Sequence, residues 1–324
     1  MKKQKKALIC GAGGFIGSHL AKRLRNEGFW LRGVDIKKPE YSKTGANEFL
    51  LLDLTYQNNC KKALTVNGGF DVIYQLAADR GGAGYMKPGE CKMMRDNALI
   101  NIYMISEAVK LIKKPKYFFS SSVCVYKDMK IGSKSIKEED VYPAFPDNEY
   151  AWEKLYTERM LTAYGNKYKM PIRIARFHTT YGPEANWEGG REKAADAISR
   201  KVAMAKDQTS IEIWGNGKSV RSFTYIDDLI NGIRALVDSK INTPTNIGSP
   251  QYVTVEELAK TIIKVSGKNL KIKHIKGPVG VEARNFSNSK IYTTGWRAKF
   301  TLEDGIKIYY PWVSSQVEKK YGLK

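Results

Sequence analysis

Histidine and cysteine are scarce in this 324-residue sequence, which has three of the first and four of the second. The histidines lie far apart, and the cysteines form neither a CxxC pair nor a spacing typical of zinc ligands. Four cysteines in a chain of this length also do not make a disulfide framework, so we expect a reducing compartment, the cytoplasm. We therefore expect no metal centre and no disulfide-stabilised fold.

Long apolar runs are also missing. No segment approaches the roughly 18 consecutive apolar residues that a membrane span needs. The N-terminal stretch MKKQKKALICGAGG begins like a signal peptide, but glycines interrupt its apolar part after about four residues. We expect a solvated basic start that leads into a first strand, and no membrane partner. Hydrophobic residues make up 42% of the chain, which is enough for a large core.

Acidic residues are outnumbered by basic ones, 33 to 54, which gives a formal net charge of +21. Such a charge favours polyanionic partners, including nucleic acids. The lysines are nevertheless spread along the chain, as in the pairs at 37–38, 61–62 and 113–114. This spread favours a solvated basic surface over a nucleic-acid site, and the resulting field would also attract an anionic small substrate.

Short apolar runs alternate with longer amphipathic stretches in the first half of the chain. The strand-like runs are 6–12, 31–36, 49–54, 70–78 and 116–126, and the helical ones are 16–28 and 93–112. This alternation predicts an α/β fold, a doubly wound parallel sheet with helices on both faces. Further helices are expected at 193–206 and 254–267, the second opened by a capping box of Thr254 and Glu257.

The pattern loosens after about residue 175, where glycines, prolines and aromatic residues cluster. We therefore expect a first domain at 1–177, to which a segment near 222–250 returns. A smaller C-terminal α/β lobe is expected to consist mainly of 178–324.

The stretch GAGGFIGSHL places Gly11, Gly14 and Gly17 between a predicted strand and a predicted helix. Such a turn lets the backbone approach a pyrophosphate, and the helix N-terminus supplies free N–H groups. Asp35 ends the next strand 18 residues after Gly17. A carboxylate there accepts from a ribose diol and repels a 2′-phosphate. The pattern predicts a Rossmann-type site that prefers NAD to NADP.

Two later positions also fit a nucleotide site. Asp53 ends the third predicted strand, where it can accept from an adenine amino group. The small residues of Leu76-Ala77-Ala78 let the chain pass close to a cofactor.

Tyr150 and Lys154 lie one helical turn apart in NEYAWEKL and so share a face. An ammonium group near a phenol lowers the pKa of the phenol, which can then act as a base near neutral pH. The pair follows the stretch SSVCVY at 121–126. On this pattern alone, Cys124 in that stretch is either small apolar filling or a group that moves a proton.

Together these motifs resemble the extended short-chain dehydrogenase/reductase superfamily, a resemblance that RFHTTYGP and RSFTYIDD continue. Closer still, the stretches LAADRGGAGY, RFHTTYGPEANWEGGREKA, EIWGNGKSVRSFTYID and GPVGVEARN resemble the family of GDP-mannose 3,5-epimerases over nearly the entire chain. The resemblance implies a GDP-sugar substrate and bound NAD. The implied reaction turns GDP-mannose into GDP-L-galactose and GDP-L-gulose through transient oxidation at carbon 4.

The same resemblance implies catalytic roles. Tyr150, helped by Lys154, takes the proton of the 4-hydroxyl, and Ser122 hydrogen-bonds the reacting oxygen. Cys124 and Lys193 exchange protons at carbons 3 and 5 from opposite faces of the ring. A ketone at carbon 4 makes these protons acidic because the resulting carbanion is an enolate. A thiol with a pKa of about 8.5 and a lysine with a lowered pKa can both exchange protons near neutrality.

Binding residues are implied as well. The implied cofactor contacts are Gly11, Gly14, Phe15, Ile16, Gly17, Asp35, Asp53, Leu54, Leu76, Ala77, Tyr150 and Lys154. The implied substrate contacts are Gly81, Ser122, Cys124, Thr179, Glu192, Lys193, Lys201, Ser219, Arg221 and Arg284, with Lys201, Arg221 and Arg284 at the diphosphate. Thr179 and Ser219 stand where the family has asparagine and glutamine, which bears on the choice of sugar and base.

Three alternatives stay open. A 4-epimerase would leave Cys124 and Lys193 without a role, and a 4,6-dehydratase typically has an Asp-Glu pair where this chain has Val123-Cys124. A non-catalytic NAD- or RNA-binding protein is favoured only by the charge. The resemblance also implies a homodimer that pairs through helices near 93–113 and 150–165.

Overall fold

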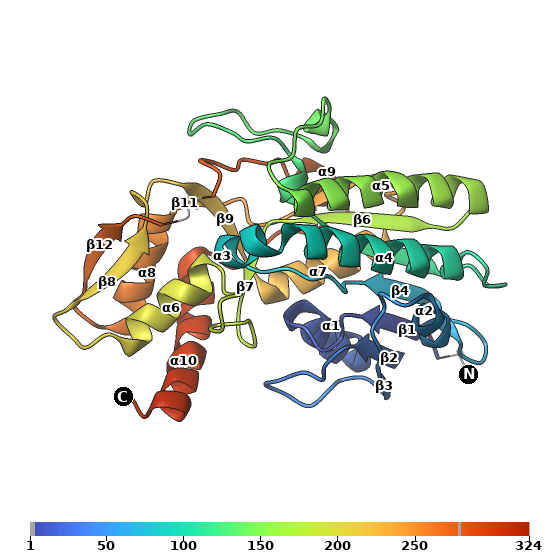
Figure 1. Cartoon of the computed structure of the whole chain (residues 1–324), viewed down its shortest axis with the longest axis horizontal. Coiled ribbons are helices and arrows are strands. Elements are labelled where there is room, and N and C mark those ends of the chain that lie inside the picture. Colours follow the sequence, from blue (N-terminus) through green and yellow to red (C-terminus); the bar gives the residue numbers. More distant parts are fainter. Residues whose placement is uncertain (1–3, 278–279, 324) are drawn as a thin grey trace.

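The computed structural model describes residues 4–277 and 280–323, so Pro278 and Val279 of GPVGVEARN lie outside it. Its largest sheet has seven strands in the order β10-β6-β5-β4-β1-β2-β3, all paired in parallel (Figure 1). The strands are β1 (Lys6–Cys10), β2 (Trp30–Asp35), β3 (Glu48–Leu51), β4 (Val72–Gln75), β5 (Lys116–Ser122), β6 (Ile172–Phe177) and β10 (Thr245–Ile247). This arrangement confirms the predicted Rossmann-type fold.

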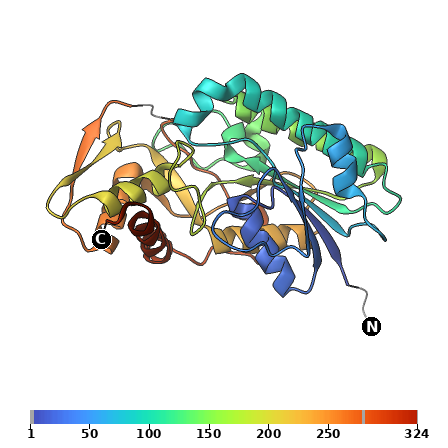
Figure 2. The same ribbon diagram turned by 60° about the horizontal axis from the view of Figure 1, so that its bottom comes forward.

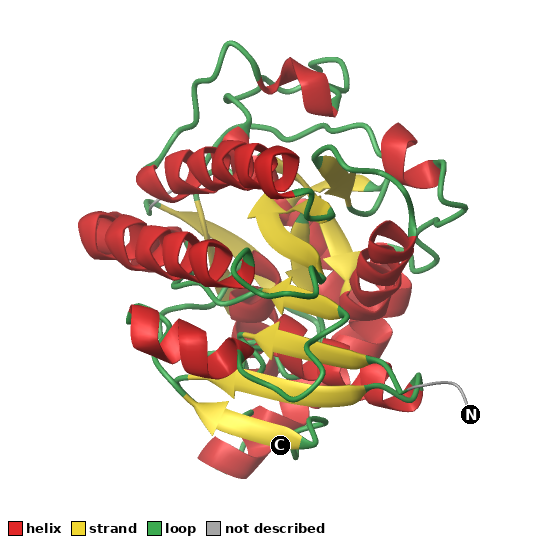
Figure 3. Ribbon diagram, turned by 90° about the vertical axis from the view of Figure 1, so that its right-hand side faces the viewer, coloured by secondary structure: helices red, strands yellow, loops and turns green. Residues whose placement is uncertain are grey.

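Helices cover both faces of the large sheet (Figure 3). One layer consists of α2 (Gln57–Leu64), α4 (Glu90–Ala108) and α5 (Glu149–Tyr168), and the other of α1 (Phe15–Asn26) and α7 (Ile226–Asp238). Successive strand residues face opposite layers. Leu8 packs in one apolar cluster with Met104 of α4, whereas Ile9 packs in another with Leu20 of α1.

A smaller group of elements lies beside the large sheet (Figures 1 and 2). Its helices are α6 (Ala194–Met204), α8 (Val255–Ser266) and α10 (Leu302–Tyr321), which pack on one another. Its strands form the pair β8 (Ser210–Trp214) and β12 (Lys271–Ile275), and the sheet β7 (Thr179–Tyr181), β9 (Val220–Tyr225) and β11 (Tyr252–Thr254). The short helices are α3 (Ala83–Met86) and α9 (Ser289–Tyr292), with 3₁₀ turns at Lys87–Gly89, Val123–Val125 and Glu138–Val141.

The boundary between the two parts is not sharp. Strand β10 pairs with β6 at the edge of the large sheet, while β9 pairs with β7 and β11. One cluster of buried apolar residues extends from Ile9 and Leu20 to Ile198 and Val313. The division at residue 177 and the return of 222–250 stay predictions.

Two local expectations have clear outcomes. The capping box of α8 is confirmed, because Thr254 Oγ1 accepts from Glu257 N at 3.0 Å and Glu257 Oε2 accepts from Thr254 N at 2.7 Å. The strand expected at 116–126 is too long, since β5 ends at Ser122 and Val123–Val125 forms a 3₁₀ turn. Ser122 Oγ accepts from Cys124 N at 3.2 Å and so caps that turn.

Within residues 4–277 and 280–323, no helix combines the length and apolar character needed to cross a bilayer. No cluster of three or more His, Cys, Asp or Glu side chains suited to a metal ion occurs there either.

Candidate active site

The glycine loop joins β1 to α1 and requires glycine for steric reasons. Gly11 has φ +84°, and a Cβ there would lie 2.8 Å from Ala77 N. A Cβ at Gly17 would lie 2.0 Å from Gly11 O. The N-terminus of α1 has no side-chain cap and no acidic residue in its first turn. The N–H groups in the first turn of α1 therefore have no side-chain cap, and the glycines leave space where a Cβ would intrude, which together fit the pyrophosphate of a dinucleotide.

Acidic side chains lie at the end of β2 and shortly after β3. Asp35 accepts from Gly13 N at 2.9 Å and from Lys37 N at 3.2 Å, so it lies directly beside the glycine loop. Burial raises the pKa of Asp35, although these backbone bonds oppose the shift. Asp53 Oδ1 accepts from Thr55 N at 2.9 Å in the turn after β3. Its contact with adenine stays a prediction.

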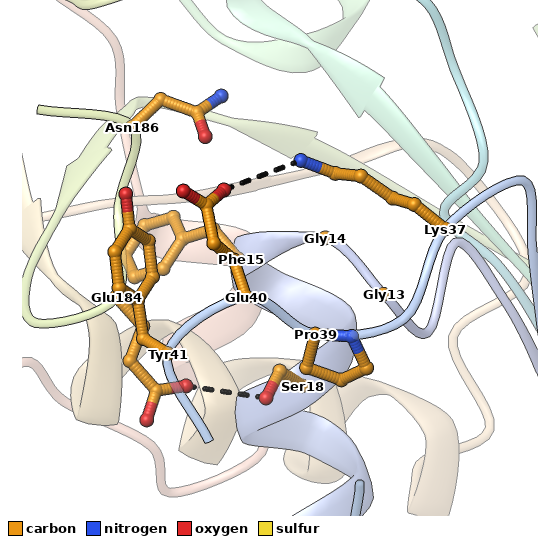
Figure 4. Close-up of a pocket in the computed structure, with 10 residues that line it drawn as sticks. All are labelled: Gly13, Gly14, Phe15, Ser18, Lys37, Pro39, Glu40, Tyr41, Glu184 and Asn186. Atoms are coloured by element: carbon orange, nitrogen blue, oxygen red, sulfur yellow. Dashed lines mark hydrogen bonds and ion pairs between the residues drawn. The ribbon is translucent and has the colours of Figure 1, made fainter. Parts of the chain in front are cut away.

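Figure 4 shows a pocket beside the glycine loop, between α1 and the segments after β2 and β7. Lys37 Nζ lies 3.7 Å from Glu40 Oε2, and Ser18 Oγ donates to Glu184 Oε2 at 3.2 Å. The lining consists of Gly13, Gly14, Phe15, Ser18, Lys37, Pro39, Glu40, Tyr41, Glu184 and Asn186. Sequence reasoning missed Glu184, which is 166 residues from Ser18 and has no local signal of this contact.

Helix α5 positions the tyrosine and lysine. It begins after Asn148, whose Oδ1 accepts from Ala151 N at 3.0 Å. Tyr150 and Lys154 are buried, with exposed fractions of 4% and 1%, and Lys154 Nζ lies 5.5 Å from the centre of the Tyr150 ring. Burial raises the pKa of Tyr150 to about 12 and lowers the pKa of Lys154. The Tyr150 hydroxyl also hydrogen-bonds Ser122 at the end of β5.

Cys124 lies in the turn after β5, partly buried, with its Sγ 4.0 Å from Arg80 Nη2. Burial alone would raise the pKa of this thiol. Arg80, and to a smaller extent Arg284 and a hydrogen bond from Ser122, bring the pKa below its ordinary value. Charged and polar groups therefore surround the Cys124 thiol, and its role in proton transfer stays a prediction.

Lys193 precedes α6 and is also partly buried. Burial, with a smaller contribution from Arg80, lowers the pKa of Lys193 to about 7, and Asp196 and Cys124 oppose the shift. Asp196 accepts from the Lys193 backbone N at 3.2 Å and from Tyr309 Oη at 2.6 Å. The structure thus brings Lys193 and Cys124 within electrostatic reach of each other.

Two loops that adjoin these groups in the chain or in space contact each other. Arg191 Nη1 lies 2.8 Å from Asp79 Oδ1, and Gly82 N donates to Arg191 O at 3.1 Å. A Cβ at Gly82 would lie 2.3 Å from Glu192 O, and one at Gly81 would lie 2.6 Å from the Tyr85 ring. We call this contact between residues 79–82 and 191–192 the loop clasp. Glu192 itself pairs with Arg200 at 3.0 Å.

Arg221 and Arg284 are neighbouring cations. Burial, with a smaller contribution from the charge of Arg284, lowers the pKa of Arg221 to about 10. Arg284 is 7% exposed, donates to Tyr126 O at 3.2 Å and has its Nη2 3.6 Å from Asp147 Oδ1. Two adjacent guanidinium groups suit a diphosphate.

Three further predicted substrate residues have the following contacts within the protein. Lys201 Nζ donates to Glu212 O at 2.6 Å, between α6 and β8. Thr179 pairs with Phe223 in the register of β7 and β9, and Ser219 O accepts from Val255 N at 3.1 Å. Their contacts with substrate stay predictions.

The chain has clear relatives among known proteins. The model of the NAD dependent epimerase/dehydratase family matches residues 7–248. The chain is 40% identical to "GDP-mannose 3,5-epimerase" of Arabidopsis thaliana over 321 residues, covering 97% of this chain and 84% of the relative. It is 39% identical to "GDP-mannose 3,5-epimerase 1" of Oryza sativa subsp. japonica, over 96% of this chain and 82% of the relative.

Solved structures show the same fold. UDP-glucose 4-epimerase of Thermotoga maritima, with UDP-glucose, has a TM-score of 0.86 at 21% identity, covering 97% of this chain and 100% of that one. UDP-glucuronic acid 4-epimerase of Bacillus cereus, in complex with UDP-glucuronic acid and NAD, has a TM-score of 0.82 at 25% identity, covering 96% and 99%. The chain belongs to the NAD dependent epimerase/dehydratase family and, within it, to the GDP-mannose 3,5-epimerases.

Proposed function

We propose that this protein is an isomerase that epimerises GDP-mannose at carbons 3 and 5 and yields GDP-L-galactose and GDP-L-gulose. The observation that supports this most strongly is that Cys124 and Lys193 influence each other electrostatically, with Arg80 acting on both and lying 5.0 Å from the Tyr150 ring. Tyr150 and Lys154 suit oxidation of a hydroxyl. Cys124 and Lys193 add the two proton-transfer groups that inversion beside the oxidised carbon requires.

The glycine loop and Asp35 would hold NAD by its pyrophosphate and adenosine ribose. When bound, NAD supplies the acceptor and donor of hydride at carbon 4. Tyr150 takes the proton of the 4-hydroxyl and later returns it, while its hydrogen bond to Ser122 orients the phenol. The Lys154 ammonium, 5.5 Å from the ring, stabilises the phenolate in a site where burial disfavours it.

Cys124 and Lys193 act when carbon 4 is a ketone. The Cys124 thiolate removes a proton from the carbon beside the ketone and becomes a thiol, leaving an enolate. The Lys193 ammonium gives a proton to the other face of that carbon and becomes an amine. Exchange with water restores both groups. A pKa of about 7 allows Lys193 to hold either protonation state at neutral pH.

The GDP moiety would lie against Arg221 and Arg284, whose adjacent guanidinium groups suit its diphosphate. Lys201 is the third cation proposed for the diphosphate, and Gly81 and Glu192 are proposed to border the sugar at the loop clasp. Thr179 and Ser219 are proposed to contact the sugar or the base from β7 and the segment before β9.

The direct test is incubation of the NAD-loaded protein with GDP-mannose in deuterated water, followed by NMR of the sugar. We expect deuterium at carbons 3 and 5 and signals of both epimers. Deuterium at carbon 5 alone would narrow the activity to one centre. If neither GDP-mannose nor any other GDP-hexose takes up deuterium, the proposal is refuted.

We further infer a homodimer that pairs through α4 and α5. These helices pack on each other and leave Met94, Trp152 and Tyr156 exposed by 37%, 41% and 51%. Exposed apolar side chains on neighbouring helices favour association with a second copy. Light scattering after gel filtration should give twice the chain mass, and Trp152→Glu should shift it to that of a monomer. A cytoplasmic location fits the four free cysteines.

A further inference from the structure

Arg80 is a charged residue in the site whose charge faces no carboxylate within ion-pair distance among the residues described. Its Nη2 lies 4.0 Å from Cys124 Sγ, and its guanidinium carbon lies 5.0 Å from the centre of the Tyr150 ring. Its Nε is buried without a hydrogen-bond partner in the described part of the chain. The neighbouring carboxylate, Asp79, is engaged instead by Arg191 and by the Tyr85 hydroxyl. Arg80 therefore points its charge at a thiol and a phenol.

A cation in such a place is costly unless an anion compensates it. The groups within reach become anionic only by losing a proton, and the thiol does so most easily. The loop clasp keeps the cation where it is, since Arg191 Nη1 also donates to the Arg80 carbonyl at 3.4 Å. A Cβ at Gly82 would collide with Glu192 O, so the two loops of the clasp can approach this closely only with glycine at position 82.

We propose that Arg80 is a positioning residue of the reaction, whose guanidinium holds Cys124 as a thiolate and eases the release of a proton from the Lys193 ammonium. One cation then prepares both proton-transfer groups. This inference rests on the proposed function in one respect, namely that the thiolate removes a proton from the carbon beside the ketone. The direction of each electrostatic effect agrees: Arg80 is the largest influence that favours the thiolate of Cys124, and it opposes protonation of Lys193.

Other charges around the thiol do not replace Arg80. Arg284 is partly neutralised by Asp147, 3.6 Å away, and Asp147 itself disfavours the thiolate. From α5, Tyr150 and Lys154 face the same space, with Glu153 Oε2 3.9 Å from Lys154 Nζ. The remaining facing groups are Lys193 and Asp196 at the start of α6, and Arg221 on β9. Among these described groups, Arg80 is the cation that contacts the Cys124 sulfur.

The test is the pH dependence of iodoacetamide alkylation at Cys124, read by mass spectrometry of its peptide in NAD-loaded protein without substrate. Because alkylation requires the thiolate, the midpoint reports the pKa of Cys124. We expect Arg80→Met to raise the midpoint by about one unit, which lowers the alkylation rate at neutral pH about tenfold. Arg80→Lys should restore most of the rate. Cys91, exposed on α4, is the internal reference, and Arg297→Met is the control for lost charge.

The outcomes separate the inference from the proposed function. An unchanged midpoint in Arg80→Met, with deuterium exchange intact in the wild type, overturns the inference alone. A raised KM for GDP-mannose with an unchanged midpoint also overturns it, and assigns Arg80 to substrate binding. A shifted midpoint with a slower kcat supports it. A shifted midpoint in a wild type that exchanges no deuterium refutes the proposed function and leaves only the electrostatic role of Arg80.

Discussion

The glycine loop and the group of Arg80, Cys124 and Lys193 are built in different ways. The loop depends on backbone shape within one strand–turn–helix unit, where Gly11 O lies against Gly17 and no side chain could replace hydrogen. The second group depends on side chains from separate segments, which the fold brings within electrostatic reach of one another. A short sequence motif can thus specify a nucleotide site, whereas the side chains of an acid–base site come together only in the folded protein.

The largest expected effect comes from removing the Cys124 thiol, which should slow proton exchange without affecting the glycine loop. Cys124→Ala should slow deuterium exchange at carbons 3 and 5 about 10³-fold, because general acid–base groups contribute about 10²- to 10⁴-fold. Its NAD affinity should stay unchanged. Cys91→Ala is the matched control. If Cys124→Ala exchanges at the wild-type rate, another group is the base.

The converse change disturbs the glycine loop and leaves Arg80, Cys124 and Lys193 unaltered. In Gly17→Ala the new Cβ would lie 2.0 Å from Gly11 O. Overpacking typically costs about 1–3 kcal/mol, so we expect NAD affinity to fall by up to roughly 100-fold in fluorescence titrations. Alkylation at Cys124 should keep its wild-type pH midpoint. Gly89→Ala serves as control because nothing lies within 4 Å of a Cβ there. Equal NAD affinities in the two variants would contradict the steric account.

A third effect concerns His178, which follows β6 where the large sheet meets the smaller part. Both ring nitrogens are buried without partners among the described residues, and burial lowers the pKa of His178 to about 3. An unfolded histidine has a pKa of about 6.5 and so binds a proton that the folded one does not. The free energy of unfolding should therefore fall as the pH drops from about 6.5 to about 3, by up to about 1.4 kcal/mol per unit.

His178→Phe should flatten this slope in urea unfolding at several pH values. The control is His274→Asn, since His274 is 40% exposed and lies on β12. A slope that survives in His178→Phe would assign the acid sensitivity to other groups, either carboxylates or His19, whose pKa burial also lowers.

The smallest expected effect is that of the clasp ion pair. Arg191 is 43% exposed, and such pairs contribute about 1 kcal/mol or less. Arg191→Met should lower kcat/KM by about fivefold at most, less at high salt, and Asp79→Asn should act non-additively with it. Lys264→Met, which breaks the exposed pair with Glu303, is the control. Additive effects of the two clasp changes would show that the pair does not act as a unit.

Much of the fold follows from local patterns. Alternating apolar runs predicted the parallel sheet, and Thr254 with Glu257 marked the start of α8 correctly. Local patterns failed where packing overrides propensity. Helix α10 runs through Pro311 because its buried face, including Tyr309 and Val313, packs against neighbouring helices. The end of β5 was misjudged because the Ser122 side chain captures a backbone N–H that would otherwise join the ladder.

The sequence by itself determined the doubly wound sheet, the glycine loop and the face shared by Tyr150 and Lys154, since strand alternation, steric demand and helical period are all local. Only the tertiary structure decided that Arg80 lies against a thiol 44 positions further along the chain. The tertiary structure also decided that Lys193, which precedes α6, is partly buried and within electrostatic reach of Arg80 and Cys124. The physical reason is that a pKa depends on burial and on charges in space, and neither is encoded by neighbours in sequence.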